Sequence, residues 1–243
     1  MTIKKTTKVL LCAIAVVLIQ CFTSAESLAE SSVAEKTNNQ DDLQAIYSKL
    51  EKTDGKVYVL NPKLSSIRIY AFRGGALSSM GHNHVLASPK FTGFVYLPTK
   101  GTSFARFDLE FRLDQLEIDN PNNRSVLGEA YASKLTLDDI VGTREHMLGE
   151  DNLQANRFPL VKIHSLHVVG EAPKLAIEIQ IELHGQQQKM LIPLSVVGLP
   201  NHLVATGAFA IRQSDFGVKP YSVFGGVLSV KNEVVIEFSL VGE

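Results

Sequence analysis

Two segments of the chain alternate strictly between apolar and polar residues. In residues 105–113, every second residue is apolar, and the residues between them are two arginines and two acids. In residues 175–184, leucine or isoleucine occupies every odd-numbered position. Successive side chains of a β-strand point to opposite faces, so each segment predicts a strand with one buried and one solvated face.

Weaker runs of the same kind predict further strands and bring the total to about eight to ten, separated by Gly, Pro and Asn turn signals. They cover residues 65–72, 91–97, 160–169, 190–196, 203–213, 223–230 and 234–241, with a hairpin at residues 184–187. A helix is expected to begin at Thr136, which can form a capping box with Asp139, and to continue toward Leu148. Gly142 interrupts this segment and predicts a short helix.

Antiparallel strands that each bury one face stack as a sandwich or close as a barrel, and closure removes the exposed edges that invite aggregation. Periodicity does not distinguish the two arrangements. An eight-stranded barrel has an interior just large enough for side chains or one ligand. The pattern therefore leaves a carrier function physically open.

The first residues predict an export signal. Lys4, Lys5 and Lys8 precede an apolar run over residues 9–19, and the small residues 23–25 follow it as a cleavage site. The run is too short to span a membrane comfortably. We expect a signal peptide over residues 1–25 and a periplasmic protein, with a lipoprotein anchored through Cys21 as the alternative.

The rest of the chain divides by composition. Residues 26–55 are polar and charged, with one amphipathic segment at 41–52, and predict a tether with a short helix. Cys12 and Cys21 both lie in the leader, so the mature protein has no cysteine for a disulfide or a thiol nucleophile. The net charge of −1 becomes more negative once the leader lysines are removed. This argues against a nucleic-acid partner, which requires clustered Lys and Arg.

His82 and His84 are the residues that most resemble metal ligands. In an extended chain they lie on the same side, about 7 Å apart. Closed zinc sites need four ligands and open ones three, and the spacing of the other histidines singles out no third ligand. His164 and His167, three apart on a predicted strand, are expected on opposite faces. The competing interpretation is that Gly81 permits a turn, and that each imidazole hydrogen-bonds to backbone or a neighbouring polar side chain near a barrel rim.

The sequence also contains no recognisable arrangement of catalytic residues. Ser214, Asp215 and His84 make a poor triad, because no Gly-x-Ser-x-Gly turn is present and adjacent Ser and Asp side chains point in different directions. The glycine pairs 74–75 and 225–226 indicate turns or bulges rather than phosphate loops. We therefore expect no enzyme, no catalytic residue, no metal and no cofactor.

Several motifs in a fixed order resemble the YceI-like family of exported, lipocalin-like lipid-binding proteins. They are Ser65-x-Ile67, Gly81-His82-Asn83-His84, Phe91-x-Gly93, Met147-Leu148, Phe158-Pro159 and Phe209-x-Ile211-Arg212-Gln213-Ser214-Asp215-Phe216-Gly217. The resemblance covers residues 56–243. It implies an all-β fold, an extended antiparallel eight-stranded calycin-type barrel around a hydrophobic tunnel, with a short helix in a connection. It also implies a polyisoprenoid or another long-chain amphiphile as ligand.

These observations lead to one expectation and two alternatives. We expect a protein that binds, and transports or stores, a long apolar ligand, without being an integral membrane protein. Phe107, Phe111 and Phe209 are the candidates for the tunnel wall, because they occupy dry-face positions, and His84 is the candidate for a head-group contact. The alternatives are a stress-response or interaction module with a filled barrel, and a metal-dependent enzyme using His82 and His84. The sequence leaves open whether the protein forms a homodimer.

Overall fold

The computed structural model describes residues 42–243, and the predicted signal peptide and Cys21 lie outside these residues. Residues 42–50 are helical. The strands are β1 (Gly55–Val59), β2 (Ser66–Gly74), β3 (His84–Ala87), β4 (Thr92–Pro98), β5 (Arg106–Arg112), β6 (Glu117–Ile118), β7 (Leu160–Glu171), β8 (Lys174–Leu183), β9 (Gln186–Val197), β10 (Leu203–Arg212), β11 (Ser222–Val223) and β12 (Leu228–Gly242). The helices α2 (Pro121–Ser125) and α3 (Leu137–Leu148) lie between β6 and β7.

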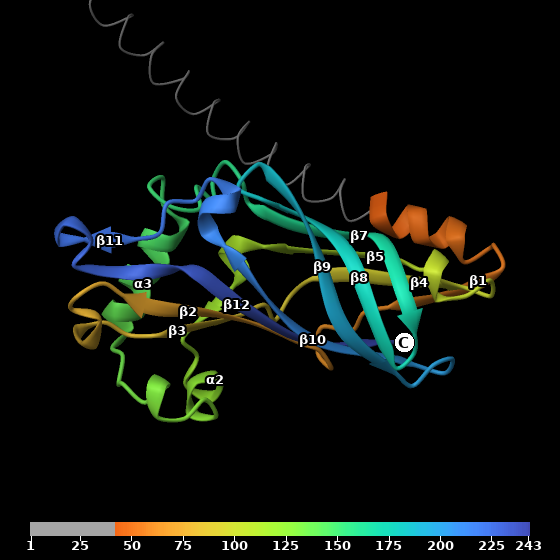
Figure 1. Cartoon of the computed structure of the whole chain (residues 1–243), viewed down its shortest axis with the longest axis horizontal. Coiled ribbons are helices and arrows are strands. Elements are labelled where there is room, and N and C mark those ends of the chain that lie inside the picture. Colours follow the sequence, from red (N-terminus) through yellow and green to blue (C-terminus); the bar gives the residue numbers. More distant parts are fainter. Residues whose placement is uncertain (1–41) are drawn as a thin grey trace, which may run out of the picture. The chain divides into compact units, whose positions relative to one another are not determined.

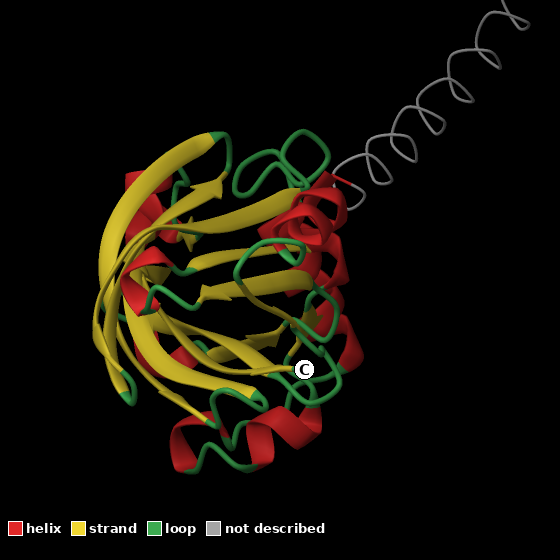
Figure 2. Ribbon diagram, turned by 90° about the vertical axis from the view of Figure 1, so that its right-hand side faces the viewer, coloured by secondary structure: helices red, strands yellow, loops and turns green. Residues whose placement is uncertain are grey.

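All twelve of these strands belong to one antiparallel sheet, ordered β1-β4-β5-β7-β8-β9-β10-β12-β2-β3-β6 with β11 beside β12. The sheet is strongly curled, and its strands enclose a common interior (Figures 1 and 2). The prediction of an all-β antiparallel barrel is confirmed.

The curled sheet closes at one end. Val59 and Glu243 exchange backbone hydrogen bonds of 2.9 and 3.0 Å, and Leu60 forms a bridge with Gly242. The chain at β1 therefore touches β4 on one side and the end of β12 on the other. A ring of β1, β4, β5, β7, β8, β9, β10 and β12 results, which is the eight-stranded core of the prediction.

The full strand count differs from that prediction, because one edge of β12 serves two partners. Its residues 229–239 pair with β2, and β3 and β6 continue the sheet from there. Alternation along a single segment does not show how an edge is shared. For this reason the sequence predicted neither the short strand β3 nor the two-residue β6.

The two segments with the clearest alternation both form strands of the sheet. β5 lies within residues 105–113, and β8 covers nearly all of residues 175–184. The end of β8 turns into β9 at His184-Gly185, as expected. Of the two runs predicted near the end of the chain, residues 234–241 lie within β12, whereas residues 223–230 cover the end of β11, a helical turn at Phe224–Gly226 and only the first three residues of β12. A register shift between Val230 and Val234 marks the break between them.

Helix α3 begins as predicted. Thr136 is its N-cap, and the side chains and backbone groups of Thr136 and Asp139 form the capping box. The helix runs through Gly142 for 12 residues, so the predicted interruption at this glycine was wrong, whereas the short helix in the connection before β7 is confirmed. A single glycine costs a helix about 1 kcal/mol, which the cap and the rest of the helix offset.

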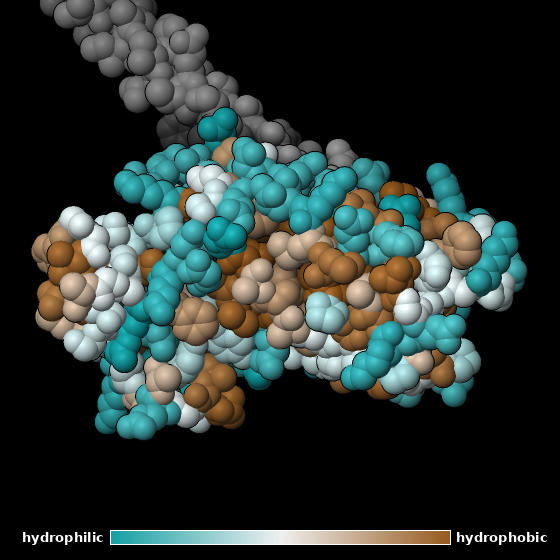
Figure 3. All heavy atoms as spheres, viewed as in Figure 1, coloured by the Kyte–Doolittle hydropathy of each residue, from teal (hydrophilic) through white to brown (hydrophobic). Residues whose placement is uncertain are grey.

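The inner and outer faces of the sheet differ as the alternation requires. Leu109, Phe111, Ile179 and Ile181 are buried in one continuous cluster. The outer surface is mixed, with hydrophilic residues lying beside exposed apolar ones (Figure 3). Leu191 is one of the exposed apolar residues. Among residues 42–243, no helix is both long enough and apolar enough to cross a bilayer.

Candidate ligand-binding cavity

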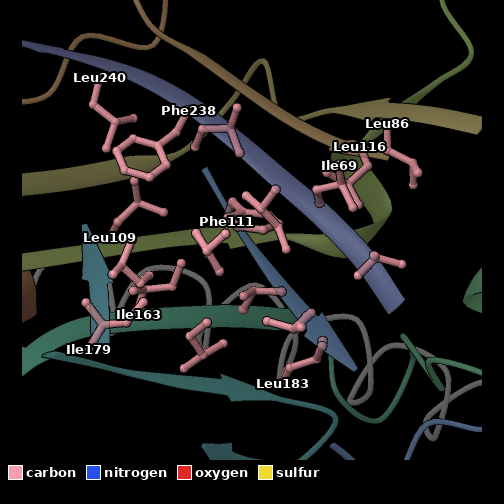
Figure 4. A pocket seen from close by; sticks show the side chains of 18 of the residues that line it. Ile69, Leu86, Leu109, Phe111, Leu116, Ile163, Ile179, Leu183, Phe238 and Leu240 are labelled. Carbon is pink, nitrogen blue, oxygen red and sulfur yellow. The ribbon is translucent and has the colours of Figure 1, made fainter. Parts of the chain in front are cut away.

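The barrel encloses a cavity of about 620 Å³. Its walls are the inward-facing side chains of β2 to β5, β7 to β10 and β12. Figure 4 shows Leu109 and Phe111 of β5 and Phe238 of β12 pointing into the same space. Small-molecule sites are typically concave, mostly apolar and about 300 to 1,000 Å³ in volume, so this cavity has the size and the lining of a ligand site.

All four residues predicted to contact a ligand line this cavity, although they do not form one cluster. Phe107 and Phe111 come from β5, Phe209 from β10 and His84 from β3. Phe111 is 7% exposed, whereas Phe107 and Phe209 are partly buried against the core. Phe209 also makes an edge-to-face contact with Phe238, with ring centroids 6.4 Å apart.

Strand pairing gives the position of each wall residue along the cavity. Phe209, Ile236, Ile69 and Leu86 are successive partners across β10, β12, β2 and β3. The next inward-facing row is Ile211, Val234, Ala71 and His84. His84 therefore lies one two-residue step, about 7 Å, closer to the end of the barrel than the row of Phe209.

Most polar groups of the lining gather at the end of the cavity where His84 lies. Apart from His84, these polar groups come from α3 and from segments beside it. Within this set, the ring of His146 in α3 packs against the ring of Tyr221, with centroids 4.7 Å apart. The set is His84, Asp138, Asp139, Thr143, His146, Asn152, Gln213 and Tyr221. We call this end the α3 end. The opposite end, near the start of β5, is apolar apart from Thr102 and Arg106.

His84 is held by a buried ion-pair network behind the cavity wall. Its Nδ1 lies 2.6 Å from Oδ2 of Asp119, whose side chain is fully buried. The other carboxylate oxygen, Oδ1, accepts hydrogen bonds from the Val85 N–H at 3.1 Å and from Nη1 of Arg124 at 2.5 Å. The carboxylate of Asp119 thus links the imidazole to a guanidinium.

The guanidinium of Arg124 is fixed in turn by Asn83, which precedes β3, and by the segment that follows α2. Its Nη1 donates to the carbonyl of Asn83, and its Nη2 donates to the carbonyl of Tyr131 and the hydroxyl of Ser133. The side chain of Arg124 is 8% exposed. These contacts make the orientation of Asp119, and through it that of His84, independent of any ligand.

The environment of Asp119 favours its ionised form. Burial by itself raises the pKa of this carboxyl, but hydrogen bonds from His84, the Val85 N–H and Arg124, together with the charge that His84 carries when protonated, outweigh burial and lower the pKa below its ordinary value. The carboxylate can therefore only accept hydrogen bonds at neutral pH.

The structure places His82 and His84 differently. His84 begins β3 and bonds to a neighbouring polar side chain, as the second interpretation of the pair proposed, whereas His82 precedes the strand. Among residues 42–243, no three His, Cys, Asp or Glu side chains are grouped as a metal site.

The predicted placement of His164 and His167 on opposite faces was wrong. A bulge in β7 between Ser165 and His167 shifts the register, so that they pair with Gln180 and Glu178. These two partners are two residues apart on β8 and share one face. A bulge adds one residue to a strand and thereby reverses the facing of every residue beyond it.

Sequence reasoning missed Asp119 and Arg124. Asp119 has a positive φ of 52° and precedes Asn120, Pro121 and Asn122, a composition that indicates an exposed turn. Nothing in that pattern signals a carboxylate buried beneath a strand 35 residues earlier. Phe238 was missed as well, although its place in an alternating run could have identified it as a wall residue.

Comparison with known proteins identifies relatives of this barrel. Residues 58–242 match the model of the YceI-like domain. The crystal structure of Burkholderia cenocepacia BcnA is similar, with a TM-score of 0.57 and 16% identity over 76% of this chain and 99% of that chain. A Campylobacter jejuni YCEI protein gives a TM-score of 0.46 and 9% identity over 63% and 81%. No curated protein sequence shows a significant match.

Proposed function

The chain belongs to the YceI-like family, and on this premise we propose that it binds a long-chain amphiphile, such as a polyisoprenoid, inside its barrel and carries or stores it in the periplasm. The apolar cavity of about 620 Å³ is the observation that carries this proposal. A barrel filled by its own side chains would leave few voids larger than a water molecule.

The energetics of a long chain fit this interior. Each methylene transferred from water to an apolar wall gains about 0.8 kcal/mol, so a tail of many carbons favours an enclosed site strongly over water. The walls between the two ends of the cavity offer aliphatic and aromatic side chains throughout (Figure 4). The role we propose is binding without catalysis, and the export signal predicted for residues 1–25 supports the periplasmic location.

A ligand-dependent stability measurement tests the proposal. We expect protein stripped of lipid by organic solvent and refolded to gain stability from a polyisoprenoid. Ligand at a hundred times its dissociation constant adds about 2.7 kcal/mol to the free energy of unfolding. Phe111→Ala enlarges a space that the ligand already occupies. We therefore expect this variant to lose mainly the stability that the ligand adds, and to lose less in the free energy of unfolding of the protein without ligand.

Phe216→Ala provides the matched control, because Phe216 is fully buried but does not line the cavity. We expect this change to cost about 3 to 5 kcal/mol with or without ligand, and Phe→Leu at both positions replaces any variant that fails to fold. If wild type gains no stability from any long-chain amphiphile, the carrier function is wrong and the filled barrel replaces it.

A further inference from the structure

We propose that the α3 end of the cavity is a subsite for an uncharged head group that donates a hydrogen bond, the hydroxyl of a long-chain alcohol, and that Nε2 of His84 accepts that bond. This inference rests on the proposed function, because it assigns the head of the ligand whose tail the cavity holds. It fixes both the chemical class of the ligand and its direction in the barrel.

The hydrogen-bond network determines which nitrogen of His84 carries the proton. Asp119 is ionised and can only accept, so the 2.6 Å contact requires a hydrogen on Nδ1 of His84. In a neutral imidazole the other nitrogen is then an acceptor. No residue of the described chain makes a hydrogen bond with Nε2, while the ring of His84 lines the cavity.

The neutral form of His84 fits the charges around it. The negative charge of Asp119 already faces the guanidinium of Arg124 at 2.5 Å. Balancing the buried carboxylate therefore does not require a second positive charge on the imidazole. A neutral His84 with its hydrogen on Nδ1 presents a lone pair, and a hydroxyl is the complementary group.

The charged side chains of the lining select against an anionic head. At the α3 end these are the two carboxylates of Asp138 and Asp139, and no Lys or Arg belongs to the lining there. Asp139 accepts hydrogen bonds from the backbone N–H and hydroxyl of Thr136, and its pKa is lowered by them. A phosphate or carboxylate head would thus meet fixed negative charges, whereas an uncharged hydroxyl would not.

The opposite end suits the tail. The walls there are formed by Leu97, Phe107, Leu175 and Leu203, among other apolar residues. The basic group of the lining, Arg106, lies at this end, and its Nε donates to Asp108 at 2.8 Å. A head group placed here would compete with an existing ion pair, and the polar residues near His84 would face hydrocarbon.

A set of ligands with one C20 isoprenoid tail tests the subsite. The probes are geranylgeraniol, its methyl ether, geranylgeranyl phosphate and geranylgeranylamine, and the measurement is the dissociation constant for refolded, delipidated full-length protein at pH 7.5. We expect the alcohol to bind roughly 3- to 10-fold more tightly than the ether, the factor of one net hydrogen bond. It should also bind more tightly than the phosphate.

Asp119→Asn gives a readout that a merely structural role would not produce. Oδ1 of residue 119 accepts from Val85 and Arg124, so the amide oxygen of Asn should remain there and its NH₂ should face Nδ1 of His84. The hydrogen of the imidazole then moves to Nε2, which becomes a donor. We expect the preference for alcohol over ether to disappear, and ¹⁵N NMR to show the changed tautomer.

Two further variants distinguish the contact with the head group from the contacts with the tail. His84→Phe should bind alcohol and ether equally well, while Phe209→Leu should weaken both ligands by the same factor. Equal binding of all four probes to wild type, or tighter binding of the phosphate or the amine, would overturn the hydroxyl subsite and leave the carrier function standing. Absence of binding by every probe would instead reject the carrier function itself.

Discussion

At the scale of single residues, Asp119 connects parts of the chain that its sequence neighbours do not reveal. Its carboxylate bonds to the backbone of β3, to the imidazole of His84 and to Arg124 of α2. Removing one partner of a buried ion pair leaves an uncompensated charge and is strongly destabilising, by about 3 to 5 kcal/mol. The segment from β3 to α2 thus depends on one carboxylate.

The lowered pKa of Asp119 predicts a stability that declines in acid. A carboxyl with a depressed pKa in the folded protein contributes stability above its unfolded pKa of about 3.9, and that contribution is lost as the pH falls through the folded pKa. We expect the difference in unfolding free energy between wild type and Asp119→Asn to be largest near pH 7 and to shrink below pH 4. Urea denaturation at several pH values measures it, and curves that stay parallel down to pH 2 would contradict it.

The face of the sheet on which a residue lies could be predicted from the sequence wherever that face follows from alternation. Phe107 and Phe111 lie on the dry face of a regular strand, so their place on the cavity wall follows from period two. His84 was selected for its chemistry, but its partner Asp119 comes from a turn whose composition gives no sign of burial. A local pattern reports a residue's face and does not report which distant group covers it.

At the scale of elements, α3 is a helix that lies across one end of the cavity and buries none of its residues fully. Arg144 ties it to the carbonyls of Asp114 and Leu116, and His146 packs on Tyr221. A helix with little buried surface depends on its own propensity and capping more than a core helix does. Its sequence could be predicted to form a helix, because the capping box is a local signal.

Gly142 and Gly207 should respond in opposite ways to substitution by alanine. A Cβ at Gly142 meets no atom within 4 Å, so Gly142→Ala should raise the unfolding free energy by about 0.5 to 1 kcal/mol. A Cβ at Gly207 would lie 2.6 Å from Cζ of Phe238 and 3.1 Å from the carbonyl oxygen of Pro193, so Gly207→Ala should lower it. Denaturation midpoints compare the two, and a loss of stability in Gly142→Ala would refute the open space above α3.

At the scale of the whole barrel, closure could not be predicted from the sequence, since sandwiches and barrels both bury one face of each strand. What decides between them is the contact of Val59 and Leu60 with residues 242–243, a pairing across 184 residues between Val59 and Glu243. Loop closure over so long a separation leaves no local trace in the sequence. The barrel was predicted from the family resemblance and not from the alternation.

Val59 and Glu243 are hydrogen-bonded to each other, so the chain enters and leaves the ring of strands at the same place. The ring could therefore form with a different strand first in the sequence. Residue 54 lies about 15 Å along β1 from that pair, a distance that a linker of roughly five or six residues spans. We expect a circular permutant that joins residue 243 to residue 54, and opens between the exposed Lys100 and Gly101, to fold and to bind the same ligand. Far-UV circular dichroism and ligand titration compare it with an unpermuted chain carrying the same linker inserted between residues 100 and 101. A permutant that stays unfolded while this control folds would show that the order of synthesis, and not the closed ring alone, determines the architecture.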